Sequence, residues 1–109
     1  MLHILQEETS FDKLIGKDNP IIVFYFTATW CMPCKMVWPK VQKLSKEYEN
    51  YILFIKIDVD DFNDLSTFCD VTCMPTFQFY RQGEKNKFDS LEGANEQELE
   101  MKCRNALSN

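Results

Sequence analysis

The sequence predicts a three-layer α/β sandwich, in which helices flank both faces of a central mixed β-sheet. Continuous apolar runs typical of strands buried on both faces alternate with helical periodicities, and a Gly-containing hairpin follows near the end. The chain has 109 residues, about one domain's length, so residues 1–109 are treated as a single domain. The expected element order is β-α-β-α-β-α-β-β-α, with the early βαβ alternation giving parallel strands.

In the first half of the chain, strands and helices alternate. A short strand is expected at residues 2–6, and a helix-start signal at residues 9–12 precedes apolar residues on one helical face. Residues 21–26 are uniformly apolar and predict a fully buried strand. Apolar residues then recur at helical spacing between residues 37 and 48, and Pro39 should kink that helix.

The second half begins with another apolar strand, residues 51–57, interrupted by Lys56. We expect Asp60 and Asp61 to cap the next helix. Residues 76–80 alternate between apolar and polar, which predicts a strand with one face less buried.

A turn at residues 82–84 should lead into a weaker strand near residues 86–90. Asn95 then caps a last helix that faces inward through Leu99, Cys103 and Ala106.

Charge and hydropathy exclude several classes of partner. Lys and Arg total 12 and Asp and Glu total 17, giving a net charge of −5. This sign disfavours a nucleic-acid binder or a polybasic membrane anchor. No apolar run approaches the roughly 20 residues that a membrane helix needs, and the first residues lack the basic start of a signal peptide. We therefore expect a cytoplasmic protein with neither nucleic-acid nor membrane partners.

Five cysteines indicate redox or metal chemistry, because an odd number without a secretory signal argues against a structural disulfide framework. Cys31 and Cys34 form a C-x-x-C pair where the buried strand ends and the long helix begins. Backbone N–H groups and the helix dipole at that position stabilise a thiolate, which predicts a lowered pKa for Cys31. Pro33 fits the first helical turn and stiffens the loop between the two cysteines.

These residues resemble those of thioredoxins of the animal cytosolic kind. The resemblance covers nearly the whole chain, and the matching segments fall in family order and spacing: residues 28–36 (ATWCMPCKM), Pro39, residues 58–61 (DVDD), residues 73–77 (CMPTF) and residues 93–95 (GAN). A thioredoxin-like sandwich and a protein-disulfide reductase activity are implied by this resemblance.

The resemblance also implies roles for individual residues. Cys31 resembles the nucleophile that attacks a substrate disulfide, and Cys34 resembles the thiol that resolves the mixed disulfide. The family's Met-Pro bond, here Met74–Pro75, is cis. An apolar rim for substrate peptides is implied at Trp30, Met74, Pro75 and Gly93.

Partners and cofactors follow from the same resemblance. Disulfide-containing proteins are the expected substrates, and an NADPH-dependent, flavin-containing thioredoxin reductase is the expected electron donor. No bound cofactor is expected, since the electrons reside on the Cys31–Cys34 pair. Such a chain would take part in electron transport and in cell redox homeostasis.

The active-site region departs from the family at two positions. Met32 replaces the usual Gly between the cysteines and is expected to alter loop stiffness, reduction potential or partner choice. Tyr25 stands where the family has a buried Asp that helps take the proton of the resolving thiol. Because a phenol is a poor base at neutral pH, we expect resolution by Cys34 to be slow.

Lys56 matches a lysine beneath the active site of some members and could favour the Cys34 thiolate, although a position on the surface at the strand end fits equally well.

Two other function classes remain open, and the remaining cysteines need separate interpretations. The departures at Tyr25 and Met32 are compatible with a redox-weak binding adaptor that uses the apolar rim. Four cysteines could alternatively form a zinc site, with C-x₂-C followed by C-x₃-C at Cys69 and Cys73. Cys69 and Cys103 are expected to be buried. Cys73 is a candidate regulatory thiol, so we expect a monomer that can form a Cys73-linked dimer on oxidation.

Overall fold

The strand that organises the fold is β2 (Ile21–Thr27), every residue of which is buried. The computed structural model describes residues 1–108 and places β2 at the centre of a five-stranded sheet. The other strands are β1 (Leu2–Ile4), β3 (Ile52–Asp58), β4 (Thr76–Arg81) and β5 (Asp89–Glu92). Their order is β1-β3-β2-β4-β5, in which β1, β3 and β2 are parallel and β4 and β5 form an antiparallel hairpin.

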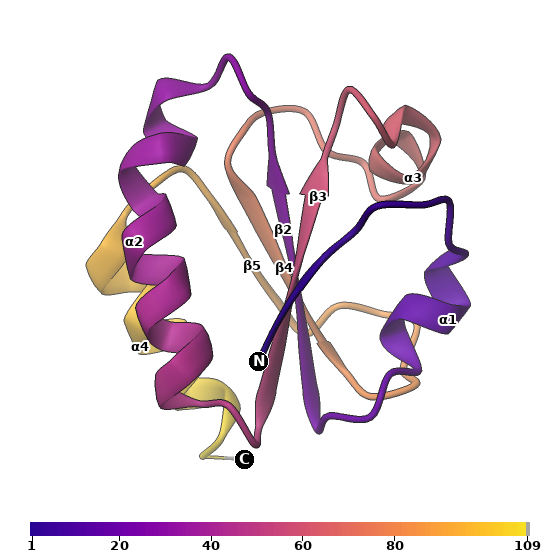
Figure 1. Cartoon of the computed structure of the whole chain (residues 1–109). Coiled ribbons are helices and arrows are strands. Elements are labelled where there is room, and N and C mark those ends of the chain that lie inside the picture. The colour runs from indigo at the N-terminus through magenta and orange to yellow at the C-terminus, as the bar shows by residue number, and fades with distance from the viewer. Residues whose placement is uncertain (109) are drawn as a thin grey trace.

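Helices cover both faces of this sheet, as Figure 1 shows. The helices α1 (Phe11–Ile15) and α3 (Asn63–Phe68) lie on one side, and α2 (Met32–Glu47) and α4 (Glu96–Ala106) lie on the other. Successive residues of β2 point to opposite faces and so enter two separate cores. Phe24 and Phe26 join the core beneath α1 and α3, whereas Val23 and Tyr25 join the core beneath α2 and α4. The predicted three-layer sandwich and its element order are confirmed.

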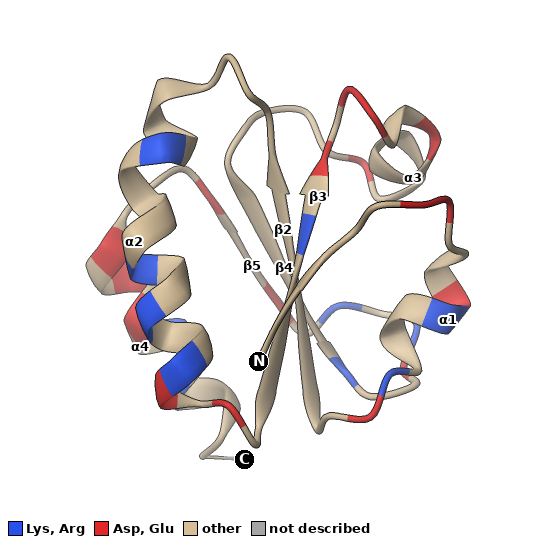
Figure 2. Cartoon of the chain, viewed as in Figure 1, with Lys and Arg blue, Asp and Glu red and all other residues tan. Residues whose placement is uncertain are grey.

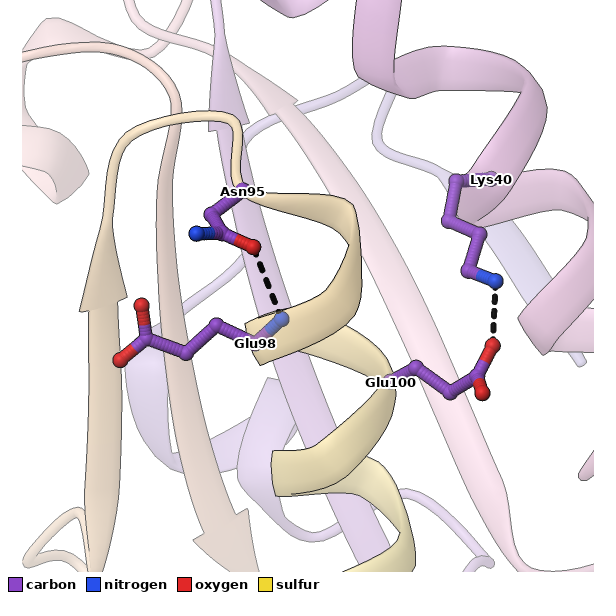
Figure 3. A network of polar contacts seen from close by, with 4 residues as sticks. All are labelled: Lys40, Asn95, Glu98 and Glu100. Atoms are coloured by element: carbon purple, nitrogen blue, oxygen red, sulfur yellow. Dashed lines mark hydrogen bonds and ion pairs between the residues drawn. The ribbon is translucent and has the colours of Figure 1, made fainter.

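Oxygen-bearing side chains cap the starts of α1 and α4. Ser10 caps α1 by accepting the N–H of Lys13, and Asn95 caps α4 by accepting the N–H of Glu98 at 3.0 Å. Figure 3 shows the second cap and, beside it, the ion pair between Lys40 of α2 and Glu100 of α4. The Asn95 prediction is confirmed. The helix α2 continues through Pro39 to Glu47.

The expected start of the third helix was wrong. Phe62 is the N-cap of α3 and makes no capping hydrogen bond through its side chain. The acidic residues before it have other partners: Asp58 Oδ1 accepts the N–H groups of Asp60 and Asp61 at 2.9 and 3.3 Å, forming a local turn. Asp60 is used elsewhere, in the site described below.

A strand at residues 76–80 with one face less buried was expected, but residues 76–80 of β4 are buried on both faces. The polar side chains on its α3 face are internally satisfied. Gln78 donates to the carbonyl of Cys69 at 2.8 Å and accepts from the Tyr80 hydroxyl at 3.0 Å. Buried hydrogen-bonded pairs of this kind leave a polar residue in a core without an unpaired group.

The last strand begins later than residues 86–90 predicted. Its first residue is Asp89, and the segment between β4 and β5 is hydrogen-bonded to the chain just before β2. Gly83 adopts a positive φ of 76° and donates its N–H to the Ile15 carbonyl at 2.8 Å, and Gln82 donates to the Pro20 carbonyl at 3.0 Å.

In the part of the chain that the structure describes, no helix combines the length and apolarity needed to cross a membrane.

Candidate active site

The two cysteines of the C-x-x-C pair lie at the carboxyl end of β2, where α2 begins (Figure 1). They form a disulfide with Cα atoms 5.3 Å apart. One helical turn separates them, which is the reason that a three-residue spacing brings the sulfurs together. Cys31 is 5% exposed and Cys34 is 1% exposed, so Cys31 is the sulfur that lies closer to solvent.

Cys31 occupies the N-cap of α2, as the sequence predicted from its position. Its Sγ accepts the backbone N–H of Cys34 at 3.3 Å, and Pro33 lies in the first turn. A sulfur at this place faces the positive end of the helix dipole and backbone donors, both of which stabilise a thiolate. The arrangement therefore allows Cys31 to act as a nucleophile when the disulfide is reduced.

Exposed apolar side chains surround the disulfide. Trp30 is 64% exposed and Met32 is 62% exposed, so both are available for contact with another molecule. The Trp30 indole is held in place because its Nε1 donates to Asp60 Oδ2 at 2.8 Å. The sequence pattern does not identify Asp60 as a partner of Trp30, since an acidic run after a strand is also typical of a helix start. No local pattern identifies this partner, because 30 residues separate the two.

The remaining predicted rim residues gather at the same end of the sheet. The start of β4 pairs with the end of β2, with Thr76 opposite Phe26. The Met74–Pro75 peptide bond before it is cis, as the resemblance implied. The Gly93 N–H donates to the Pro75 carbonyl at 2.8 Å, and Met74 packs against the core that contains both cysteines.

A cavity of about 360 Å³ adjoins Cys34 and is lined by residues of β2, α2 and β3. The residues that line it include Tyr25, Cys34, Lys35, Trp38, Lys56 and Asp58. Tyr25 stacks on Phe77 and on Trp38, with ring centroids 4.9 and 6.0 Å apart, and the ammonium of Lys56 lies 4.4 Å from the centroid of the Trp38 ring. Of the two positions considered for Lys56, the structure shows the one near the active site.

Tyr25 contacts the resolving-cysteine position through the backbone. Its hydroxyl donates to the Cys34 carbonyl at 3.0 Å, and burial raises the pKa of the phenol above its usual value. At neutral pH the residue is therefore a hydrogen-bond donor and an aromatic packing element, not a base.

The other three cysteines lie apart from this pair. Cys69 and Cys103 are buried, as predicted, and burial raises their pKa values to about 11 and about 12. Cys73 is exposed, and its Sγ lies 3.9 Å from Thr76 Oγ1. Within residues 1–108, no group of three or more His, Cys, Asp or Glu side chains is placed to hold a metal ion.

Charges of opposite sign border the site. Basic residues are spaced along α2, whereas acidic residues gather in the segment after β3 (Figure 2). A partner that approaches the disulfide thus meets Lys35 on the α2 side and Asp60 beside Trp30 on the other.

Comparison with known proteins agrees with this geometry. The Thioredoxin family matches residues 2–105. A thioredoxin of Ictalurus punctatus is 50% identical over 104 residues, covering 94% of each chain, and the thioredoxin of Homo sapiens is 40% identical over 101 residues, covering 92% of this chain and 93% of that one. The crystal structure of mitochondrial thioredoxin 3 from Saccharomyces cerevisiae, in its oxidised form, superposes with a TM-score of 0.84 at 38% identity, covering 95% of this chain and 94% of that one.

The sequence match and the structural match extend over nearly the whole chain and include the disulfide at the start of α2. They favour an oxidoreductase over a binding adaptor, since a paired dithiol at a helix N-terminus is the chemistry that disulfide exchange requires. The chain therefore belongs to the thioredoxin family and is a thiol–disulfide oxidoreductase that reduces protein disulfides.

Proposed function

We propose that Cys31 is the nucleophile and Cys34 the resolving thiol in this reaction. The observation that carries the assignment is the position of Cys31 at the N-cap of α2, where its Sγ accepts a backbone N–H and is the less buried of the two sulfurs. A Cys31 thiolate attacks the substrate disulfide and forms a mixed disulfide. Cys34 then attacks Cys31, which releases the reduced substrate and forms the internal disulfide.

Trapping the mixed disulfide tests this assignment. In a Cys34→Ser variant, the nucleophile should stay attached to a substrate protein, and mass spectrometry should locate the bond at Cys31. In a Cys31→Ser variant, no such adduct should form at Cys34. An adduct found at Cys34 in the second variant, at a rate comparable to the first, contradicts the assignment.

Substrates are proposed to bind along the rim formed by Trp30, Met74, Pro75 and Gly93, with Met32 adding apolar surface next to Cys31. Support comes from the exposure of Trp30 and Met32 and from the hydrogen bond that holds Gly93 against Pro75. Replacing Trp30 by Ala should lower kcat/KM for a protein disulfide more than for a small disulfide reagent. Equal losses on both would argue against a contact with the protein substrate.

The electrons are proposed to come from NADPH through a separate flavin-containing thioredoxin reductase, so that the chain needs no bound cofactor. Support comes from the family and from a redox pair made of two side chains of this chain. Oxidation of NADPH, followed by absorbance, should depend on both proteins and on a disulfide substrate. If the reductase does not reduce the Cys31–Cys34 pair, a different donor is needed.

We place this activity in the cytoplasm, where it contributes to electron transport and redox homeostasis, with the chain acting as a monomer. Three free cysteines among residues 1–108 fit a reducing compartment. Microscopy of a fluorescent fusion tests the location.

The exposed Cys73 is proposed to link two chains when peroxide is present. Non-reducing electrophoresis should show a dimer band in peroxide-treated protein, and a band that persists in Cys73→Ser contradicts the proposal.

A further inference from the structure

The resolving step needs a base, and the residues around Cys34 limit which group can supply it. When the substrate forms a mixed disulfide with Cys31, the Cys34 thiol must lose its proton before it can attack. Cys34 is 1% exposed, so bulk water does not reach the thiol freely. The proton acceptor must therefore lie in the cavity that Cys34 lines.

Tyr25 is not that acceptor, although it occupies the position of the family's buried acid. Its hydroxyl proton is engaged with the Cys34 carbonyl at 3.0 Å, and burial raises the pKa of the phenol. Stacking on Phe77 and Trp38 further fixes the ring on the core side of the cavity. A protonated phenol in this setting can donate a hydrogen bond but cannot take the thiol proton.

The other charged groups facing the cavity come from α2 and β3. Lys35 belongs to α2, and Lys56 and Asp58 belong to β3, two residues apart and therefore on the same face of the strand. Both lysines carry ammonium groups, which stabilise a neighbouring thiolate but are donors only. Among the described residues that line the cavity, Asp58 is the one with a carboxylate.

A local turn fixes the Asp58 carboxylate at the edge of this cavity. Its Oδ1 accepts the N–H groups of Asp60 and Asp61 at 2.9 and 3.3 Å. A cavity of about 360 Å³ has room for several waters, each of which occupies about 30 Å³ in the liquid. Asp58 of β3 and Cys34 of α2 thus line one cavity that has room for several waters.

We propose that Asp58 is the proton acceptor for Cys34 and receives the proton through water in this cavity. The proposal rests on the assignment of Cys34 as the resolving thiol. In the step, the Cys34 S–H proton passes through water to the Asp58 carboxylate, and the Cys34 sulfur attacks the Cys31 sulfur. The Cys31–Cys34 bond forms while the bond from Cys31 to the substrate sulfur breaks, and the substrate leaves as a thiolate that takes up a proton from the medium.

The matched test compares Asp58→Asn with Asp61→Asn in a Cys73→Ser background. The Asn amide oxygen at position 58 can still accept the two backbone N–H groups, so the turn is kept while the base is lost. Asp61→Asn removes the same charge from a residue that does not line the cavity. Reduced protein is mixed with one equivalent of 5,5′-dithiobis(2-nitrobenzoic acid), and stopped-flow absorbance follows the release of two coloured thiolates, the first on attack by Cys31 and the second on resolution.

We expect the second phase to slow about tenfold or more in Asp58→Asn, a loss within the range for a general base, and to be unchanged in Asp61→Asn. The direction is diagnostic. If Asp58 acted only as a nearby negative charge, its removal would make the Cys34 thiol easier to ionise and the second phase faster. A second phase in Asp58→Asn that equals or exceeds that of Asp61→Asn overturns the proposal.

The pH dependence of the native chain gives an independent readout. If a base in the cavity takes the proton directly, the reaction starts from the neutral Cys34 thiol, so the second phase should vary little between pH 6 and pH 8. Without such a base, the rate should rise about tenfold per pH unit, because only the pre-formed thiolate then reacts. The steeper profile in the native chain overturns the proposal even if Asp58→Asn does not fold. If only one thiolate is released, the failure lies instead with the resolving role of Cys34.

Discussion

Cys34 and Cys69 are both buried and are both held by the sheet in the same way, yet only Cys34 lies in a reactive pair. The carbonyl of Cys34 accepts the Tyr25 hydroxyl at 3.0 Å, and the carbonyl of Cys69 accepts Gln78 Nε2 at 2.8 Å. The two anchors come from opposite faces of the sheet, since Tyr25 belongs to the core beneath α2 and Gln78 bonds toward α3.

The difference lies in the end of the helix at which each cysteine is placed. Cys34 lies in the first turn of α2, next to free backbone N–H groups, whereas Cys69 is the C-cap of α3, where carbonyl groups face outward. Burial raises the pKa of the Cys69 thiol to about 11. Burial and anchoring alone therefore leave a cysteine inert, and a helix N-terminus with a partner sulfur one turn away is what adds reactivity.

The largest effect that would break this comparison concerns activity. Cys31→Ser should reduce turnover of a protein disulfide to the uncatalysed rate, because the nucleophile is removed. Cys69→Ala should retain most of the activity, since Cys69 lies outside the site. The measurement is NADPH consumption coupled to a reductase. Residual turnover in Cys31→Ser, or a comparable loss in Cys69→Ala, would make the two helix ends equivalent.

Alkylation rates sharpen the comparison in the native sequence. With a pKa of about 11, the thiolate fraction of Cys69 at pH 7 is on the order of 10⁻⁴, and its side chain is 7% exposed. Iodoacetamide added to the reduced, folded protein should therefore label Cys31 and the exposed Cys73 while Cys69 and Cys103 stay unmodified. Peptide mass spectrometry over a time course measures this. Early labelling of Cys69 contradicts the inert assignment.

Alkaline pH should weaken the fold through the same two inert thiols. Their pKa values are raised on folding, so above pH 9 the unfolded chain loses these protons while the folded chain retains them. Stability from these groups is complete below pH 9 and is lost as pH rises toward 11 and 12, by up to about 1.4 kcal/mol per pH unit for each thiol.

Denaturant titrations at pH 8 and pH 10.5 measure this loss. A double variant, Cys69→Ala with Cys103→Ala, should lose less stability across that interval than the native chain does. The buried tyrosines also titrate above pH 10, and the variant retains them as an internal control. Equal losses in both proteins contradict the assigned cause.

The two carbonyl anchors should contribute unequally. Gln78→Leu leaves both the Cys69 carbonyl and the Tyr80 hydroxyl without their buried partner, so we expect a loss of about 2 kcal/mol or more in the free energy of unfolding. Tyr25→Phe removes one hydrogen bond and keeps the ring stacking, with a loss of about 1 kcal/mol. Guanidinium unfolding of the oxidised proteins measures both. A larger loss in Tyr25→Phe reverses the expected order.

The order of elements could be predicted because each strand and helix carries its own local pattern. The uniformly apolar run at residues 21–26 predicted a buried strand, and Asn95 predicted the start of α4. The interpretation of residues 76–80 failed because Gln78 looks like a solvent-facing residue in sequence. Its burial depends on the Cys69 carbonyl and Tyr80, and only the packing of α3 against β4 brings that carbonyl to it.

The site was predictable to the extent that its chemistry is written in adjacent residues. The Cys31–Cys34 pair was found from its C-x-x-C spacing together with its place between a buried strand and a long helix. Asp60 and Asp58 were missed as members of the site because one meets Trp30 across 30 residues and the other meets Cys34 through a cavity shared by two elements. An acidic run after a strand has the same appearance whether it caps a helix or faces a neighbouring loop.

The central position of β2 has a consequence for synthesis on the ribosome. Both of its neighbours, β3 and β4, follow it in the sequence, and the pairing with β4 requires the chain up to Arg81. At about 5–20 residues per second, β2 and its apolar run at residues 21–26 wait several seconds with both edges unpaired. During that interval the nascent chain exposes an aggregation-prone segment, and holding chaperones are the class of protein that would shield it.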